Sequence, residues 1–164
     1  MNNLNVEELL FEACDSFIKN IDKYNWALLY ESDFRSAIYA ELIKSMDEKQ
    51  FNNYQIWTEY KYGAYSADIA LGPKKEIAIE TKFAYTYFPL KKSDLLQAKN
   101  QLVNYLENGA KKAYLLFLEH QLPPESEPLC DIIDLKELEL TGDCREVDGE
   151  EVSGDKFLIA NLAR

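Results

Sequence analysis

The spacing of apolar residues predicts helices first and strands afterwards. Apolar side chains recur every three or four positions over residues 4–22 and 32–46, which is the spacing of one helix face. Ser32 is the expected N-cap of the second helix. Residues 55–62, 66–71 and 76–82 are short, rich in β-branched or aromatic residues, and separated by turn residues. They predict three strands, the last two joined in a hairpin by residues 72–75.

The second half of the chain continues this alternation. A third helix is expected from Ser93 or Asp94 to Asn108, where Gly109 would end it, and residues 112–118 form an apolar strand. Residues 119–155 form an acidic excursion whose 143–155 part reads as an exposed turn region, and 156–162 read as a closing strand. This order predicts one α/β domain over 1–164, with a core at about 31–118 and a central mixed sheet flanked by helices. The first helix is then an N-terminal extra and the acidic segment a C-terminal extension.

The charge is unevenly distributed along the chain. Eighteen Lys and Arg stand against 29 Asp and Glu, for a net charge of −11, whereas a protein that binds phosphates usually carries a basic surface. However, residues 119–155 alone hold 13 acids and two bases, and the rest of the chain is neutral. Residues 74–112 carry eight lysines against four acids. The acidity is therefore local and does not exclude a nucleic-acid partner.

The cysteines and the apolar runs indicate the compartment. Cys14, Cys130 and Cys144 are odd in number and form no CxxC pair, which argues against a disulfide framework and a structural zinc site. No apolar run approaches membrane-spanning length, and residues 1–4 do not open a secretory signal. We therefore expect a reduced, cytoplasmic protein without a membrane partner.

Two carboxylates and a lysine are expected to meet on the hairpin. Strand alternation places Glu80 and Lys82 on one face, and the 72–75 turn places Asp68 opposite Glu80 to within about one residue of register. Oxygen ligands of this kind suit Mg²⁺ or Mn²⁺, and a lysine beside such an ion can orient or deprotonate an attacking water. The alternative is an exposed hairpin whose charges form weak surface ion pairs.

The run Asp68…Glu80-Thr81-Lys82 resembles the PD-(D/E)xK nuclease superfamily, which includes restriction endonucleases and archaeal Holliday-junction resolvases. The resemblance implies a restriction-endonuclease-like αβββαβ core, which matches the order of elements from Ser32 to Leu118. It also implies that Asp68, Glu80 and the Thr81 carbonyl are metal ligands and that Lys82 activates water. An acid on the first core helix often joins the metal ligands; Glu31 is preferred to Glu41 because it stands at the helix start.

The next helix extends the resemblance. Gln101 and Tyr105 resemble the Q-x-x-x-Y element that follows the ExK strand in exonuclease-like members, and Ala67 replaces the proline expected before the first acid. Tyr85, Tyr87 and Phe88, followed by Lys91 and Lys92, form an aromatic and basic stretch that would either contact bases and phosphates or pack beneath a loop.

The resemblance implies Mg²⁺- or Mn²⁺-dependent hydrolysis of phosphodiester bonds, with DNA favoured because most of the superfamily cuts DNA. Gln101, Tyr105, Lys91 and Lys92 are the expected substrate contacts. The rival interpretation is an inactive protein of the same fold that binds nucleic acid or protein. In that case the acidic 119–155 region would hold a protein partner or a second copy. Glu59 either reaches the site from the neighbouring strand or faces solvent. The only histidine, His120, is expected in a loop.

Overall fold

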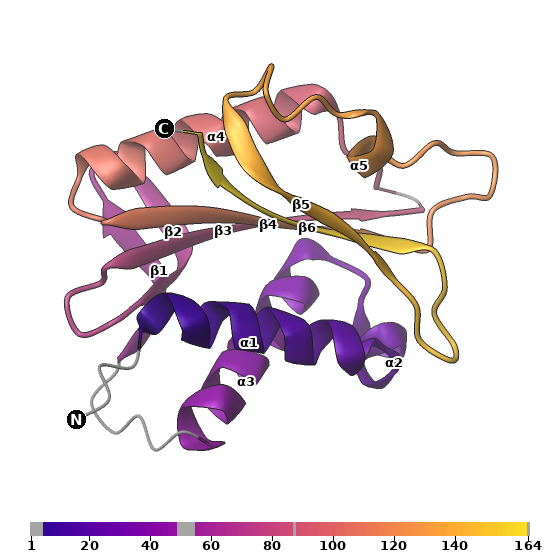
Figure 1. The fold of residues 1–164 in the computed structure, drawn as a ribbon, viewed down its shortest axis with the longest axis horizontal. Coiled ribbons are helices and arrows are strands. Elements are labelled where there is room, and N and C mark those ends of the chain that lie inside the picture. Colours follow the sequence, from indigo (N-terminus) through magenta and orange to yellow (C-terminus); the bar gives the residue numbers. More distant parts are fainter. Residues whose placement is uncertain (1–4, 49–54, 87, 164) are drawn as a thin grey trace.

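A six-stranded mixed sheet separates two layers of helices (Figure 1). The computed structural model describes residues 5–48, 55–86 and 88–163. The strands lie in the order β1-β2-β3-β4-β6-β5, and β3 and β4 are the parallel pair. Their bounds are β1 Ile56–Tyr62, β2 Tyr65–Leu71, β3 Ile77–Tyr85, β4 Lys112–His120, β5 Leu140–Val147 and β6 Asp155–Leu162. The predicted α/β class with a central mixed sheet is confirmed.

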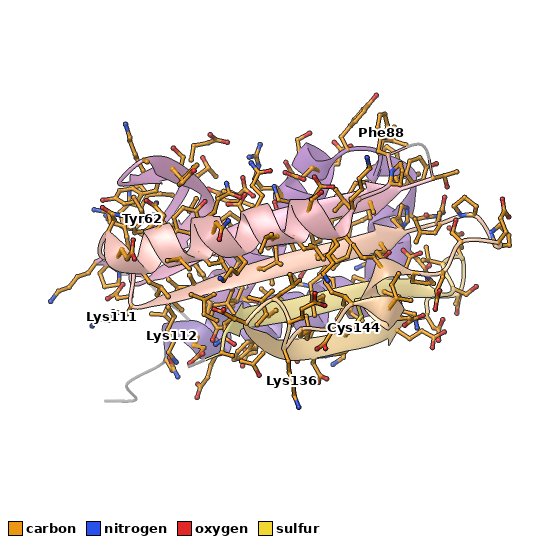
Figure 2. All side chains as sticks on the ribbon, turned by 90° about the horizontal axis from the view of Figure 1, so that it is seen from above. Tyr62, Phe88, Lys111, Lys112, Lys136 and Cys144 are labelled. Carbon is orange, nitrogen blue, oxygen red and sulfur yellow. A yellow bond between two sulfur atoms is a disulfide. The ribbon has the colours of Figure 1, made fainter. Side chains whose placement is uncertain are left out.

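Each face of the sheet has its own apolar core. Helices α1 (Val6–Lys19), α2 (Ile21–Tyr24) and α3 (Glu31–Glu48), with the 3₁₀ turn η1 (Asn25–Ala27), lie on one face, and α4 (Lys92–Glu107) and α5 (Leu129–Ile132) on the other. Ile77 and Ile79 of β3 pack in the α1/α3 core, whereas Ala78 packs in the α4 core. Seen from the α4 side, Tyr62 and Lys111 lie at one end of the domain and Phe88 at the other (Figure 2).

The helix ends differ in detail from the expectation. The predicted helix 4–22 is interrupted at Asn20, the C-cap of α1, whose backbone amide donates to the carbonyls of Ser16 and Phe17. Ser32 lies inside α3 rather than capping it. The carboxylate of Asp33 accepts hydrogen bonds from the amides of Leu29 and Tyr30, so this acid satisfies the free donors at the helix start.

The structure of the acidic segment differs most from the expectation. Residues 143–155 were expected as an exposed turn region, but β5 pairs antiparallel with β6 from Leu140 opposite Leu162 to Val147 opposite Asp155. Because β5 is an edge strand, only its ends are buried, and the polar residues between them conceal the strand pattern in the sequence. The segment therefore completes the sheet on the edge opposite β1.

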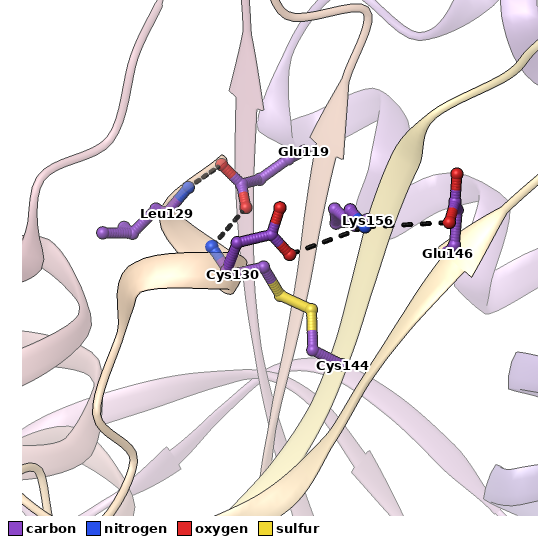
Figure 3. Close-up of a disulfide and its surroundings, with 7 residues drawn as sticks. Glu119, Leu129, Cys130, Cys144, Glu146 and Lys156 are labelled. Atoms are coloured by element: carbon purple, nitrogen blue, oxygen red, sulfur yellow. Dashed lines mark hydrogen bonds and ion pairs between the residues drawn. A yellow bond between two sulfur atoms is a disulfide. The ribbon is translucent and has the colours of Figure 1, made fainter. Parts of the chain in front are cut away.

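The expectation that the chain lacks disulfides is also wrong. Cys130 of α5 and Cys144 of β5 are joined by a disulfide (Figure 3), with their Cα atoms 6.2 Å apart. Cys14 is free and buried. Beside the disulfide the buried carboxylate of Glu119 accepts the amides of Leu129 and Cys130 at 2.7 and 2.6 Å. The pairing depends on how α5 packs against the sheet, which cysteine spacing does not reveal.

Within the described ranges, none of the helices has the length and apolar character needed to traverse a lipid bilayer.

Candidate active site

The candidate site lies where β2 and β3 separate. Their ladder runs from Leu71 opposite Ile77 to Ile69 opposite Ile79 and stops there. Beyond this point β2 continues only with β1, and β3 only with β4. Asp68 and Glu80 are the next residues on the two strands, so both carboxylates stand at the mouth of the gap. The ladder has the register in which one further pair would set Asp68 opposite Glu80, as predicted, but the two strands no longer pair at that point.

Residues of β3 and of α3 hold the Asp68 carboxylate. Its Oδ2 accepts hydrogen bonds from the amide and the hydroxyl of Thr81, each at 2.7 Å, and its Oδ1 accepts one from Nη1 of Arg35 at 3.1 Å. The amide and carbonyl of a strand residue face the same neighbouring strand. The Thr81 carbonyl therefore faces the same gap, where β2 has ceased to pair with β3.

Glu80 is almost fully buried, at 4% exposed. Its Oε2 accepts a hydrogen bond of 2.6 Å from the Tyr105 hydroxyl, and its Oε1 lies 3.5 Å from the Lys82 ammonium. Burial, followed by the nearby Asp68 carboxylate, raises the pKa of Glu80 to about 7, against the opposing effects of Tyr105 and Lys82. Two carboxylates close together resist double ionisation, and a cation between them would relieve that repulsion.

The first turn of α3 supplies the helix acid. Glu31 Oε1 lies 3.9 Å from the Lys82 ammonium, and burial raises the pKa of Glu31. Glu41, the alternative, is buried elsewhere: its two carboxylate oxygens accept the Ser16 and Tyr24 hydroxyls at 2.5 and 2.8 Å. The geometry therefore brings Glu31, and not Glu41, to the cluster.

Sequence reasoning missed Arg35. This residue follows Glu31 by one helical turn, and its guanidinium lies between Asp68 and Glu59, with a Glu59 contact of 2.8 Å. The β1–β2 ladder pairs Thr58 with Ile69 and Tyr60 with Ala67 but skips Glu59, whose φ of 56° is uncommon for a residue with a side chain. The spacing of Glu31 and Arg35 along α3 is the sequence signal that could have identified Arg35.

The four expected substrate contacts lie at different depths. Tyr105 is fully buried, so its hydroxyl reaches Glu80 from within the domain. Gln101 lies one turn earlier on α4, and its buried Oε1 has no hydrogen-bond partner among the residues described. Lys91 and Lys92 are exposed at the start of α4, about 20 Å along the helix from Tyr105, and Lys92 pairs with Glu137 at 2.6 Å. The structure thus brings Tyr105 to the acids and leaves the two lysines at a distance.

His120 occupies the end of β4 rather than the expected loop. It is fully buried, its Nδ1 lies 2.5 Å from Asp155 Oδ2, and its ring stacks beside Tyr85. Asp155 also accepts the amide of Gln121. This pair joins β4 to β6 in the core, and the candidate acids lie elsewhere on the sheet.

The donor atoms near the gap, two carboxylates and a backbone carbonyl, are of the kind that a hard divalent cation prefers. Three His, Cys, Asp or Glu side chains grouped to hold a metal ion do not occur in the described part of the chain. The Arg35 guanidinium instead supplies the positive charge beside Asp68. A cation at the gap would therefore share Asp68 with Arg35 or displace it.

Comparisons of the chain with protein-family models, with curated proteins and with solved structures yield no match. The function is therefore inferred from the side chains gathered at the gap and from the order of the elements that carry them.

Proposed function

We propose that this protein is a metal-dependent nuclease of the PD-(D/E)xK type that hydrolyses phosphodiester bonds, with DNA as the favoured substrate. The observation that carries the proposal is the convergence of Asp68, Glu80 and Lys82 at the β2–β3 gap. Residues from both helical layers reach this gap, Arg35 from α3 and Tyr105 from α4. A pair of surface ion bridges would not require support from both layers.

Asp68, Glu80, the Thr81 carbonyl and Glu31 are the residues that would hold Mg²⁺ or Mn²⁺ in this proposal. The bound cation would supply Lewis-acid stabilisation of the negative charge that builds up on the phosphate. Because burial and Asp68 raise the pKa of Glu80 to about 7, this carboxyl carries a proton on roughly half of the cation-free molecules near neutral pH. The proton must leave before Glu80 can act as a ligand.

The other side chains position the reacting groups. The Lys82 ammonium lies between Glu80 and Glu31, where it can hold a water molecule by donating a hydrogen bond to its oxygen. Only after the ammonium has released a proton can the neutral amine accept one from the attacking water. The Tyr105 hydroxyl fixes one oxygen of Glu80, which leaves Oε1 directed toward Lys82. Arg35 balances the charge of Asp68 before a cation arrives.

Incubation with supercoiled and linear DNA in the presence of Mn²⁺ tests the proposal and reports whether internal or terminal bonds are cut. We expect Lys82→Ala to abolish cleavage while Mn²⁺ binding and folding persist, because Lys82 is not a ligand. Lys99→Ala is a matched control, since both lysine side chains are 17% exposed and both pair with a glutamate. Mn²⁺ binding should be lost when Asp68 and Glu80 are both replaced by Ala. Wild-type cleavage by Lys82→Ala would remove the lysine from the mechanism.

One observation favours the alternative of an inactive binding module. The Arg35 guanidinium already neutralises Asp68, as expected of a site that has no need of a cation. In that case the protein would neither bind Mn²⁺ nor cut DNA. A protein partner would then meet the exposed edge strand β5, whose acids favour a basic partner over a second copy carrying the same charge.

A further inference from the structure

An aromatic pocket adjoins the candidate site and has no role in the chemistry proposed above. It encloses about 460 Å³, which is within the usual range for ligand pockets. Its wall includes Tyr30, Phe83, Phe88 and Leu90, together with Glu31 of the candidate site. Since Glu31 also faces the Lys82 ammonium, the pocket and the acid cluster share a wall.

Two aromatic rings at this pocket are exposed although their backbones are fixed. Tyr30 is 57% and Phe88 54% exposed, and their ring centroids lie 5.8 Å apart. The amide of Tyr30 donates to the Asp33 carboxylate at the start of α3. Phe88 is held by two backbone hydrogen bonds to Tyr85 at the end of β3. Exposed aromatic surface on a fixed backbone is costly in water and typical of a binding site.

Cationic groups lie near the pocket, although its wall itself contains the Glu31 carboxylate. Lys91 is exposed directly after Leu90, and α4 begins at Lys92, so the positive end of a 16-residue helix lies beside the pocket wall. Asp94 in the first turn of that helix bonds the Lys91 amide, which leaves the Lys91 ammonium as the nearby cation. Lys91 follows the wall residue Leu90, and the Lys82 ammonium contacts the wall residue Glu31, so both cations are near the phosphates that would flank a base in the pocket.

We propose that this pocket binds an unpaired nucleobase next to the phosphodiester bond that is cut, so that the substrate is DNA with a single-stranded end or segment. The inference rests on the proposed nuclease function and adds its substrate class. Paired bases are hidden inside a duplex, whereas an unpaired base presents its face to an aromatic ring. Tyr30 and Phe88 stack on that base, and Glu31 places it against the acid cluster.

Binding measured in EDTA separates the pocket from the cleavage chemistry. Fluorescence anisotropy would compare a blunt DNA duplex with the same duplex carrying a short single-stranded overhang. We expect tighter binding of the overhang substrate, and roughly 5- to 100-fold weaker binding of it by Tyr30→Ala or Phe88→Ala, with blunt-duplex binding unchanged. Tyr30→Phe should retain the wild-type affinity because the ring remains. Ile132→Ala is the control, since Ile132 is 55% exposed and lies outside this pocket.

A second readout reports base stacking directly. The fluorescence of 2-aminopurine placed in the overhang should be quenched when the wild-type protein binds and should stay unquenched with the Phe88→Ala protein. Equal affinity for blunt and overhang DNA, or unquenched 2-aminopurine, would overturn the inference. So would a change of oligomeric state in Tyr30→Ala or Phe88→Ala without a change in DNA affinity, because the pocket would then receive a second copy.

The two proposals fail in different ways. Overhang preference without Mn²⁺-dependent cleavage would retain the base pocket and refute the nuclease. If blunt and overhang DNA are cut equally well, and Phe88→Ala cuts as well as wild type, the nuclease proposal would stand and the base pocket would be refuted.

Discussion

Replacing Glu80 by Gln should make the cation-free protein more stable above neutral pH. The folded-state pKa of Glu80 is about 7, against an ordinary value of 4.5, and burial is the main cause. A group whose pKa rises on folding binds its proton more tightly in the folded state. Its contribution to stability is therefore complete below pH 4.5 and is lost as the pH rises from 4.5 to about 7.

The size of this effect follows from the shift. Each pKa unit corresponds to about 1.4 kcal/mol, so ionising Glu80 in the folded protein costs about 3 kcal/mol. Solvent screening removes little of this cost because the side chain is only 5% exposed. Glutamine carries no charge at any pH, and its amide oxygen can still accept the Tyr105 hydroxyl. The variant should therefore gain about 2–3 kcal/mol relative to wild type between about pH 5 and pH 8.

Urea unfolding in EDTA at these two pH values measures the gain. Glu41→Gln is the matched control, since Glu41 is also buried but both of its oxygens accept hydroxyl protons. An amide can replace only one of these acceptors, so this control should lose stability at pH 8. If Glu80→Gln shows the same stability difference from wild type at both pH values, burial and Asp68 do not govern the ionisation of Glu80.

Three further predictions concern Tyr105, the disulfide and the acidic edge. Tyr105→Phe keeps the buried ring but removes the hydrogen bond that lowers the pKa of Glu80, so the pH midpoint of Mn²⁺ binding should rise; an unchanged midpoint would show that the hydroxyl has no such role. Reduction of the Cys130–Cys144 bond opens a cross-link between residues 14 positions apart and should cost about 3 kcal/mol in urea unfolding, a loss that the double Ser variant should no longer show on adding reductant. Neutralising Glu146, Asp148, Glu150 and Glu151 should change DNA affinity only slightly, and less at higher salt, because β5 lies on the edge of the sheet away from the β2–β3 gap. A many-fold rise in affinity would instead show that this segment covers the DNA-binding surface.

The sequence predicts well those features that depend on one element or on one short turn. Strand alternation and the 72–75 turn placed Asp68 opposite Glu80, and the position of Glu31 at a helix start brought it to Lys82. Helical spacing placed Gln101 and Tyr105 on one face of α4. These relations are set by backbone geometry over a few residues, which a single sequence contains in full.

Periodicity and turn patterns do not predict contacts between elements that are far apart in the sequence. Arg35 reaches Asp68 only because α3 packs against β3, which neighbours β2, and Cys130 meets Cys144 only because α5 packs near the edge strand. The polar surface of β5 conceals its pairing with β6, and the burial of His120 depends on Asp155, 35 residues further along the chain. Each of these contacts follows from the tertiary packing, for which local periodicity gives no signal.

The contacts between the two ends of the described chain have a consequence for biosynthesis. Phe17 of α1 packs against Phe157 of β6, the Asp15 carboxylate pairs with Arg145, and Asp22 accepts the amides of residues 150–152. In the sheet, β6 lies between β4 and β5, so the order of strands is complete only when β6 is present. During translation, α1 therefore emerges long before the strand that covers it. Helix α3 and Tyr114 of β4 cover part of its apolar face earlier, but the part that meets Phe157 stays available to chaperones until about residue 160 has left the ribosome. We expect a nascent chain that lacks β6 to remain unfolded and sensitive to protease.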